Sequence, residues 1–138
     1  MVTSKQKRLS KSRINRKLRD KMILIIEDDY DLLWLMKKFL SINGFKVLTA
    51  VTAKEAGKIF TRNKKKINAV ILDLSLPDKN GKKVCQEFKN VSPDTPIFIT
   101  TGFEDPSQQI ELEKIGVDGY LVKPYNFKEL VKMLSRVA

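Results

Sequence analysis

The chain has 138 residues, 42% of them hydrophobic, and is long enough to bury one apolar core. It contains no histidine and one cysteine, Cys85, which excludes histidine-dependent catalytic triads, histidine-ligated zinc sites and internal disulfide bonds. A lone cysteine is typical of a reducing compartment, and we expect no transmembrane segment because no apolar run approaches roughly 18 residues.

The net charge of +11 is distributed unevenly along the chain. Residues 1–21 contain nine Lys/Arg and one Asp, whereas the rest of the chain contains 18 basic and 15 acidic residues. The first 20 residues have no aromatic side chain and few apolar ones, so they cannot bury enough surface to offset the entropy of ordering them. We expect residues 1–20 to form a basic, disordered extension and residues 21–138 to form one domain.

From residue 22 onward, short continuous apolar runs alternate with segments whose apolar side chains repeat at helical spacing. Continuous apolar runs are typical of strands that are buried on both faces of a sheet. The predicted strands are residues 22–26, 45–50, 67–72, 97–101 and 120–122. The predicted helices that follow them lie around residues 32–40, 52–62, 84–88, 107–115 and 127–137.

Local signals predict how several helices begin and end. Asn43-Gly44 and Gly116 are expected to end the first and fourth helices, since glycine readily adopts the left-handed conformation found there. Thr52 and Asn126 are expected to cap the second and fifth helices at their amino ends. Trp34 is expected to pack, at least in part, on the first helix.

Five strands in strict alternation with five helices predict a parallel sheet with helices on both faces. In such sheets the functional groups gather beyond the carboxyl ends of the strands. The residues at these ends are Glu27, Asp28, Asp29, Asp73, Thr101 and Lys123. We therefore expect acidic groups, a hydroxyl and an amine to lie together at one edge.

Clustered carboxylates repel one another unless a cation neutralises them, and hard oxygen ligands favour Mg²⁺. A carboxylate can also act as a nucleophile and form an aspartyl phosphate. Phosphoryl transfer mainly requires that the phosphoryl group be positioned and its oxygens neutralised. A metal ion, the hydroxyl of Thr101 and the ammonium of Lys123 can each meet one of these oxygens.

The segments that carry these residues resemble the receiver domain of two-component response regulators. The resemblance rests on residues 23–29, 70–78 with Gly81, 96–102 and 119–124. It covers about residues 21–138, and the basic extension lies outside it. It implies a flavodoxin-like, doubly wound (βα)5 α/β fold, in which a five-stranded parallel sheet has the order 2-1-3-4-5.

The resemblance also implies a metal and a phosphoacceptor. Asp73 would accept the phosphoryl group and contribute to binding Mg²⁺. Asp28 would bind the metal directly, Glu27 would assist, and Ser75 would offer its backbone carbonyl. Asp29 lies one position beyond the usual acidic pair, and we expect it to cap a helix.

The remaining implied roles concern the switch. Thr101 would act as the switch hydroxyl, and the ring of Tyr120 would turn inward when Thr101 moves. Lys123 would pair with Asp73 or its phosphate. The peptide bond between Lys123 and Pro124 would be cis. The implied protein is a cytoplasmic signalling switch rather than an enzyme. It would receive its phosphoryl group from a sensor histidine kinase or a histidine phosphotransfer protein, and present an altered surface to a downstream partner.

Alternatives stay open for the function and for the extension. A phosphatase with an aspartate nucleophile would carry an acid two residues after Asp73, where this chain has Ser75. A degenerate receiver would act only as a binding or dimerisation module, although the intact acidic, hydroxyl and amine set argues against it. The basic extension is either a solvated leader or an attachment to nucleic acid or another anionic surface.

Overall fold

The structure is a computed structural model in which residues 19–136 are described. The predicted disorder of the basic extension therefore concerns residues outside the described part, apart from Arg19 and Asp20. Asp20 already belongs to the fold, since its backbone N–H donates to the carbonyl of Gly44 at 2.9 Å. Among the described residues, no helix is both long enough and apolar enough to cross a membrane.

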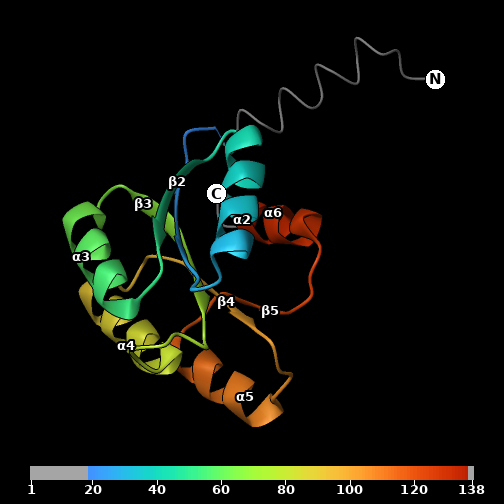
Figure 1. Cartoon of the computed structure of the whole chain (residues 1–138). Coiled ribbons are helices and arrows are strands. Elements are labelled where there is room, and N and C mark those ends of the chain that lie inside the picture. Colours follow the sequence, from blue (N-terminus) through green and yellow to red (C-terminus); the bar gives the residue numbers. More distant parts are fainter. Residues whose placement is uncertain (1–18, 137–138) are drawn as a thin grey trace.

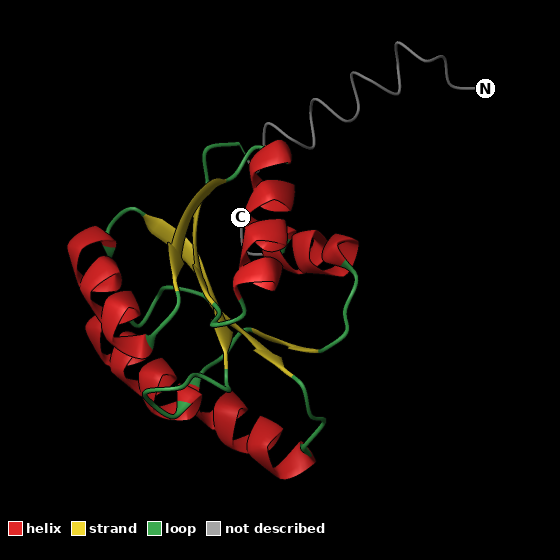
Figure 2. Cartoon of the chain, viewed as in Figure 1, coloured by secondary structure: helices red, strands yellow, loops and turns green. Residues whose placement is uncertain are grey.

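Within residues 19–136, five strands alternate with five helices, as predicted (Figure 2). The strands are β1 Met22–Ile26, β2 Lys46–Ala50, β3 Ile67–Asp73, β4 Ile97–Thr101 and β5 Gly119–Val122. The helices are α2 Tyr30–Ile42, α3 Ala53–Asn63, α4 Gly81–Val91, α5 Pro106–Ile115 and α6 Phe127–Ser135.

The five strands form one parallel sheet in the order β2-β1-β3-β4-β5, which confirms the expected doubly wound fold. Helices α2 and α6 lie on one face of the sheet, and α3, α4 and α5 cover the other (Figure 1). Because every strand runs in the same direction, the loops that follow the strands all emerge at one edge.

Each face of the sheet buries its own apolar cluster, because side chains alternate along a strand. Leu24 and Leu72 belong to the cluster under α3, α4 and α5, where Phe60 and Phe88 stack with their ring centroids 4.1 Å apart. Ile25 belongs to the cluster on the opposite face, under α2 and α6. Burial on both faces explains why the strands are continuously apolar in the sequence.

Capping residues begin and end several helices at the positions that the sequence predicted. Thr52 and Asn126 accept hydrogen bonds from the first turns of α3 and α6. Asn43 caps the carboxyl end of α2, and Gly44 follows with a φ of 92°. Gly116 ends α5 with a φ of 105°, a value that favours glycine.

Trp34 packs only in part on α2, as predicted: it is 58% exposed, and the ammonium of Lys38 on the same helix lies 4.8 Å from the centroid of its ring. The buried stripe of α2 runs through Leu33, Met36 and Leu40, which turns residue 34 outward. At the other end of the chain, α6 stops at Ser135 rather than continuing to residue 137.

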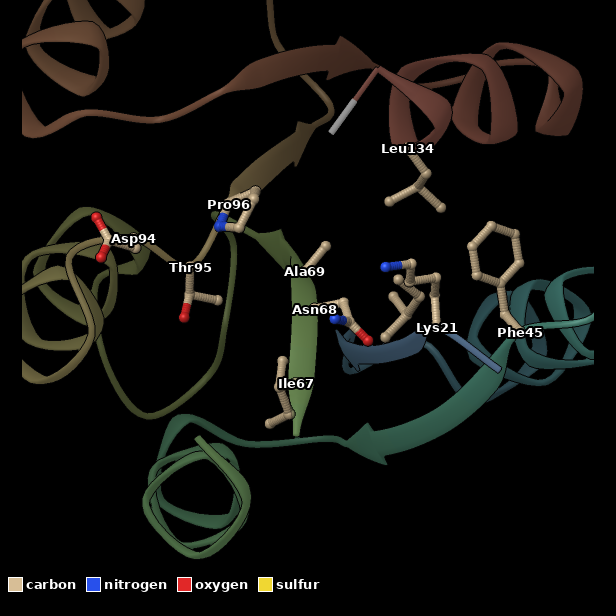
Figure 3. A pocket seen from close by; sticks show the side chains of 10 residues that line it. Lys21, Phe45, Ile67, Asn68, Ala69, Asp94, Thr95, Pro96 and Leu134 are labelled. Carbon is tan, nitrogen blue, oxygen red and sulfur yellow. The ribbon is translucent and has the colours of Figure 1, made fainter. Parts of the chain in front are cut away.

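A cavity of about 290 Å³ opens near the amino ends of the strands (Figure 3). Its wall includes Ile67 at the start of β3 and Pro96 just before β4. The side-chain carbonyl of Asn68, also on this wall, accepts a hydrogen bond from the N–H of Met22 at 2.8 Å and so serves the fold. The cavity lies at the edge opposite to the predicted site.

Candidate functional site

Three acidic side chains meet at the carboxyl edge of the sheet. Glu27 and Asp28 follow β1, and Asp73 ends β3, the strand that pairs with β1. The register pairs Ile26 with Leu72, which brings the next residues of both strands side by side. One carboxylate oxygen from each acidic residue lies within 4.8 Å of the others. Parallel pairing alone therefore assembles the acidic cluster.

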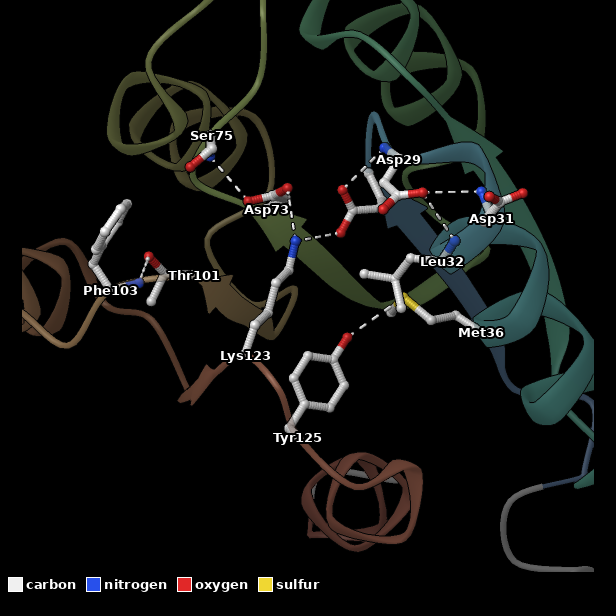
Figure 4. Close-up of polar contacts among 11 residues, drawn as sticks. Asp29, Asp31, Leu32, Met36, Asp73, Ser75, Thr101, Phe103, Lys123 and Tyr125 are labelled. Carbon is white, nitrogen blue, oxygen red and sulfur yellow. Dashed lines mark hydrogen bonds and ion pairs between the residues drawn. The ribbon is translucent and has the colours of Figure 1, made fainter.

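The three carboxylates differ in burial. Glu27 and Asp73 are each only 2% exposed, whereas Asp28 is exposed. Buried carboxylates are costly unless they are paired with positive charge or hydrogen-bonded. Lys123, which follows β5, supplies that charge: its Nζ lies 2.7 Å from Oε1 of Glu27 and 3.1 Å from Oδ2 of Asp73 (Figure 4).

Lys123 thus connects three strand ends. The sequence predicted its pairing with Asp73 but missed the shorter contact with Glu27. The two residues are 96 positions apart, and no local pattern in the sequence relates them. The peptide bond between Lys123 and Pro124 is cis, as the resemblance implied.

The two buried carboxyl groups have different proton affinities. Burial, with help from the neighbouring Asp73 carboxylate, raises the pKa of Glu27 to about 7 despite the nearby Lys123. Burial also acts to raise the pKa of Asp73, but its hydrogen bonds outweigh this effect and hold the pKa below its usual range. Two of these bonds come from the N–H of Ser75 at 3.0 Å and from Lys123. Asp73 is therefore ionised at neutral pH, as a carboxylate nucleophile must be.

The donor set suits a hard divalent cation. Such ions take carboxylate oxygens as ligands, and the exposed Asp28 gives an ion access to the two buried carboxylates. The predicted metal-binding residues Glu27, Asp28 and Asp73 are thus brought together. The predicted role of the Ser75 carbonyl stays a prediction, because the contact between Ser75 and Asp73 is made through the N–H.

The two predicted switch residues lie on neighbouring strands, Thr101 at the end of β4, which pairs with β3, and Tyr120 within β5. Thr101 ends β4, is 3% exposed, and accepts a hydrogen bond from the N–H of Phe103 at 3.3 Å. Tyr120 is half-buried, and its hydroxyl donates to the carbonyl of Phe103 at 3.3 Å. Both side chains therefore bond to the same loop between β4 and α5.

Two further acidic residues shape the loops of the site. Asp29 caps α2 by accepting hydrogen bonds from the N–H groups of Asp31 and Leu32, which confirms its predicted capping role. Asp78 was missed. Its carboxylate accepts hydrogen bonds from the N–H groups of Ala53 at 2.8 Å and Lys54 at 3.0 Å. It thereby ties the loop after Asp73 to the start of α3. The two residues are 25 positions apart, so no local sequence pattern predicts this contact.

A family model for the response regulator receiver domain matches residues 23–135. A probable transcriptional regulator ycf27 of Porphyridium aerugineum is 38% identical over 115 residues, which are 83% of this chain and 47% of that protein. The chain thus spans about half the length of this curated relative.

Solved structures are similar over most of the chain. A response regulator receiver domain protein from Clostridium thermocellum superposes with a TM-score of 0.81 at 33% identity, covering 85% of this chain and 93% of that one. A response regulator protein from Burkholderia pseudomallei superposes with a TM-score of 0.76 at 27% identity, covering 83% and 66%. The latter structure contains a phosphorylated aspartic acid and a calcium ion.

Proposed function

Because the chain belongs to the response regulator receiver domain family, we propose that it is a switch in which Asp73 accepts a phosphoryl group. Members of this family are signalling switches of two-component pathways rather than classical enzymes. The observation that carries the proposal is the buried, ionised carboxylate of Asp73, which lies beside two further carboxylates and the ammonium of Lys123.

The reaction follows from these groups. An oxygen of Asp73 attacks the phosphorus of a phosphohistidine on the donor protein, the new O–P bond forms, and the P–N bond to the donor imidazole breaks. Lys123 lies close enough to neutralise the charge that gathers on the phosphoryl oxygens. Asp28 and Asp73, with Glu27 in support and the carbonyl of Ser75 as a further ligand, would hold Mg²⁺, which would supply further neutralisation. The phosphorylated aspartic acid of the Burkholderia relative supports this assignment.

The switch is proposed to involve Thr101 and Tyr120. Their hydroxyl groups bond to the N–H and the carbonyl of the same residue, Phe103. A phosphoryl group on Asp73 would compete for the hydroxyl of Thr101 and thereby free Tyr120 to turn inward. The surface formed by α5, β5 and α6 would then change and be presented to a downstream partner.

The proposal includes partners, a location and a division of the chain. The donor is a sensor histidine kinase or a histidine phosphotransfer protein in the cytoplasm, where the single thiol of Cys85 stays reduced. Residues 21–138 form the receiver domain, and residues 1–20 form a basic extension. A degenerate receiver that serves only as a binding module is not favoured, since the acidic cluster and Lys123 are both in place.

Magnesium binding should depend on pH in a defined direction. Glu27 carries a proton below about pH 7 in the metal-free protein, and a bound cation must displace it. The affinity for Mg²⁺ should therefore rise with pH, by at most about tenfold per unit, and level off above about pH 7. The same raised pKa makes the metal-free protein lose stability as the pH rises from Glu27's ordinary range to about 7, because the folded state binds the extra proton.

Calorimetric titrations with MgCl₂ from about pH 5.5 to about pH 8 check this dependence. Glu27→Gln cannot release a proton, so its weaker binding should be flat across the same window. An affinity of the natural protein that does not change with pH would contradict the assignment of Glu27 to the metal site.

The function itself is tested by incubation with acetyl phosphate, a small phosphodonor. We expect the intact mass to increase by one phosphoryl group when Mg²⁺ is present, and no increase when a chelator has removed it. Sustained release of phosphate from p-nitrophenyl phosphate, without a labelled protein, would instead indicate a phosphatase. An unchanged mass at saturating donor and Mg²⁺ would favour the degenerate receiver.

A further inference from the structure

The positive charge of the described residues is concentrated on one side of the fold. Residues 54–91, which include most of α3 and all of α4, contain ten Lys/Arg and four Asp/Glu. Residues 19–53 contain five of each kind, and residues 92–138 contain five basic and seven acidic residues. The net charge of the domain is therefore small only because its segments compensate one another. The side formed by α3 and α4, which pack side by side, is basic (Figure 1).

A groove of about 530 Å³ lies on this side. Lys54, Lys58 and Arg62 of α3 line it, and all three are exposed. They follow one another at intervals of four residues, so they form a row about 12 Å long along one face of the helix. Gly57 has no side chain, and a Cβ built on it would meet no atom within 4 Å, so the groove is open at this position.

The cations of this row are available to a ligand. Among residues 19–136, no carboxylate lies within 4.0 Å of the charged nitrogens of Lys54, Lys58 or Arg62. On the opposite wall, Lys79 is neutralised by Glu87 at 3.0 Å. Within the described part of the chain, the groove thus presents three positive charges in a line that no carboxylate pairs.

We infer that this groove binds the phosphodiester backbone of a nucleic acid, without reading its bases. Interfaces between proteins are depleted of lysine and enriched in aromatic residues at their centres, whereas this groove is lined by lysines and has no aromatic side chain. Nucleic-acid interfaces are polar and strongly positive. Without aromatic rings for base stacking, binding depends on phosphates and on salt rather than on sequence.

The test is the salt dependence of DNA binding by the full chain, measured by fluorescence anisotropy on a short mixed-sequence duplex. In K54Q/K58Q/R62Q the slope of log K against log salt should become shallower by about 2–3, since each lost phosphate contact changes it by about 0.9. The matched control is K114Q/K128Q/K132Q, which removes the same charge from exposed positions of α5 and α6. Its slope should stay close to that of the natural protein.

Equal slopes for the two triple variants would overturn the inference, because the attraction would then be general rather than local to the groove. Displacement of the duplex by polyglutamate at equal charge concentration would also overturn the inference, because it would indicate an acidic protein as the ligand. Labelling by acetyl phosphate should be the same in both triple variants and the natural protein. A failure of DNA binding is therefore distinguishable from a failure of the proposed phosphorylation.

Discussion

Replacing Asp73 by Asn should abolish labelling by acetyl phosphate in the presence of Mg²⁺. The substitution keeps the size of the side chain but removes the negative oxygen that attacks phosphorus and one of the carboxylates of the metal site. Asn keeps one carbonyl oxygen that can accept from the N–H of Ser75, and Lys123 keeps its contact with Glu27, so the domain should remain folded. Intact mass spectrometry measures the loss, and thermal unfolding followed by circular dichroism checks the fold.

Asp29→Asn is the matched control. Asp29 is exposed and caps α2 with its side chain, and Asn is an equally good cap. This variant should be labelled to the same extent as the natural protein. Labelling of Asp73→Asn at the natural level, with the phosphoryl group mapped to another residue, would refute Asp73 as the acceptor.

Replacing Gly81 by Ala should destabilise the domain by about 1–3 kcal/mol, the usual cost of forcing an extra group into packed structure. A Cβ at this position would lie 2.7 Å from Cα and 3.0 Å from the carbonyl oxygen of Leu74. These are backbone atoms of the residue that follows Asp73, so the clash cannot be relieved by a side-chain rotation alone. The same shift should weaken Mg²⁺ binding, because it displaces the loop between Asp73 and α4.

The control for this substitution is Gly57→Ala in the middle of α3, where a Cβ would meet no atom within 4 Å. Alanine is the better helix former, so this variant should be stabilised by up to about 1 kcal/mol. Urea unfolding of both variants provides the comparison. If Gly81→Ala unfolds at the same urea concentration as the natural protein, this result would contradict the close packing of Gly81 in α4 against the backbone of Leu74.

The features that were predictable from the sequence are those that depend on local patterns. The apolar runs of β1 and β3 predicted buried parallel strands because both faces of the sheet are covered. The rule that parallel strands end at one edge then predicted that Asp28, Asp73 and Lys123 lie together. Capping residues such as Thr52 were visible because a cap bonds to N–H groups only two or three positions away.

The features that were missed depend on contacts between distant segments. The bond from Lys123 to Glu27 and the clamp from Asp78 to α3 join residues 96 and 25 positions apart. The pKa of Glu27 likewise arises from burial beside Asp73, which no sequence pattern expresses.

The central claim is that one pocket at the carboxyl edge of the sheet holds both a divalent cation and the phosphoryl group. A crystal structure of the protein with Mg²⁺ and beryllofluoride, a mimic of the phosphoryl group, tests it most directly. We predict one Mg²⁺ bound by Asp28 and Asp73, beryllofluoride on Asp73, and the ammonium of Lys123 and the hydroxyl of Thr101 in contact with fluorine atoms. An Asp73 free of beryllofluoride at saturating concentrations, or a cation bound away from Asp28 and Asp73, would contradict the account.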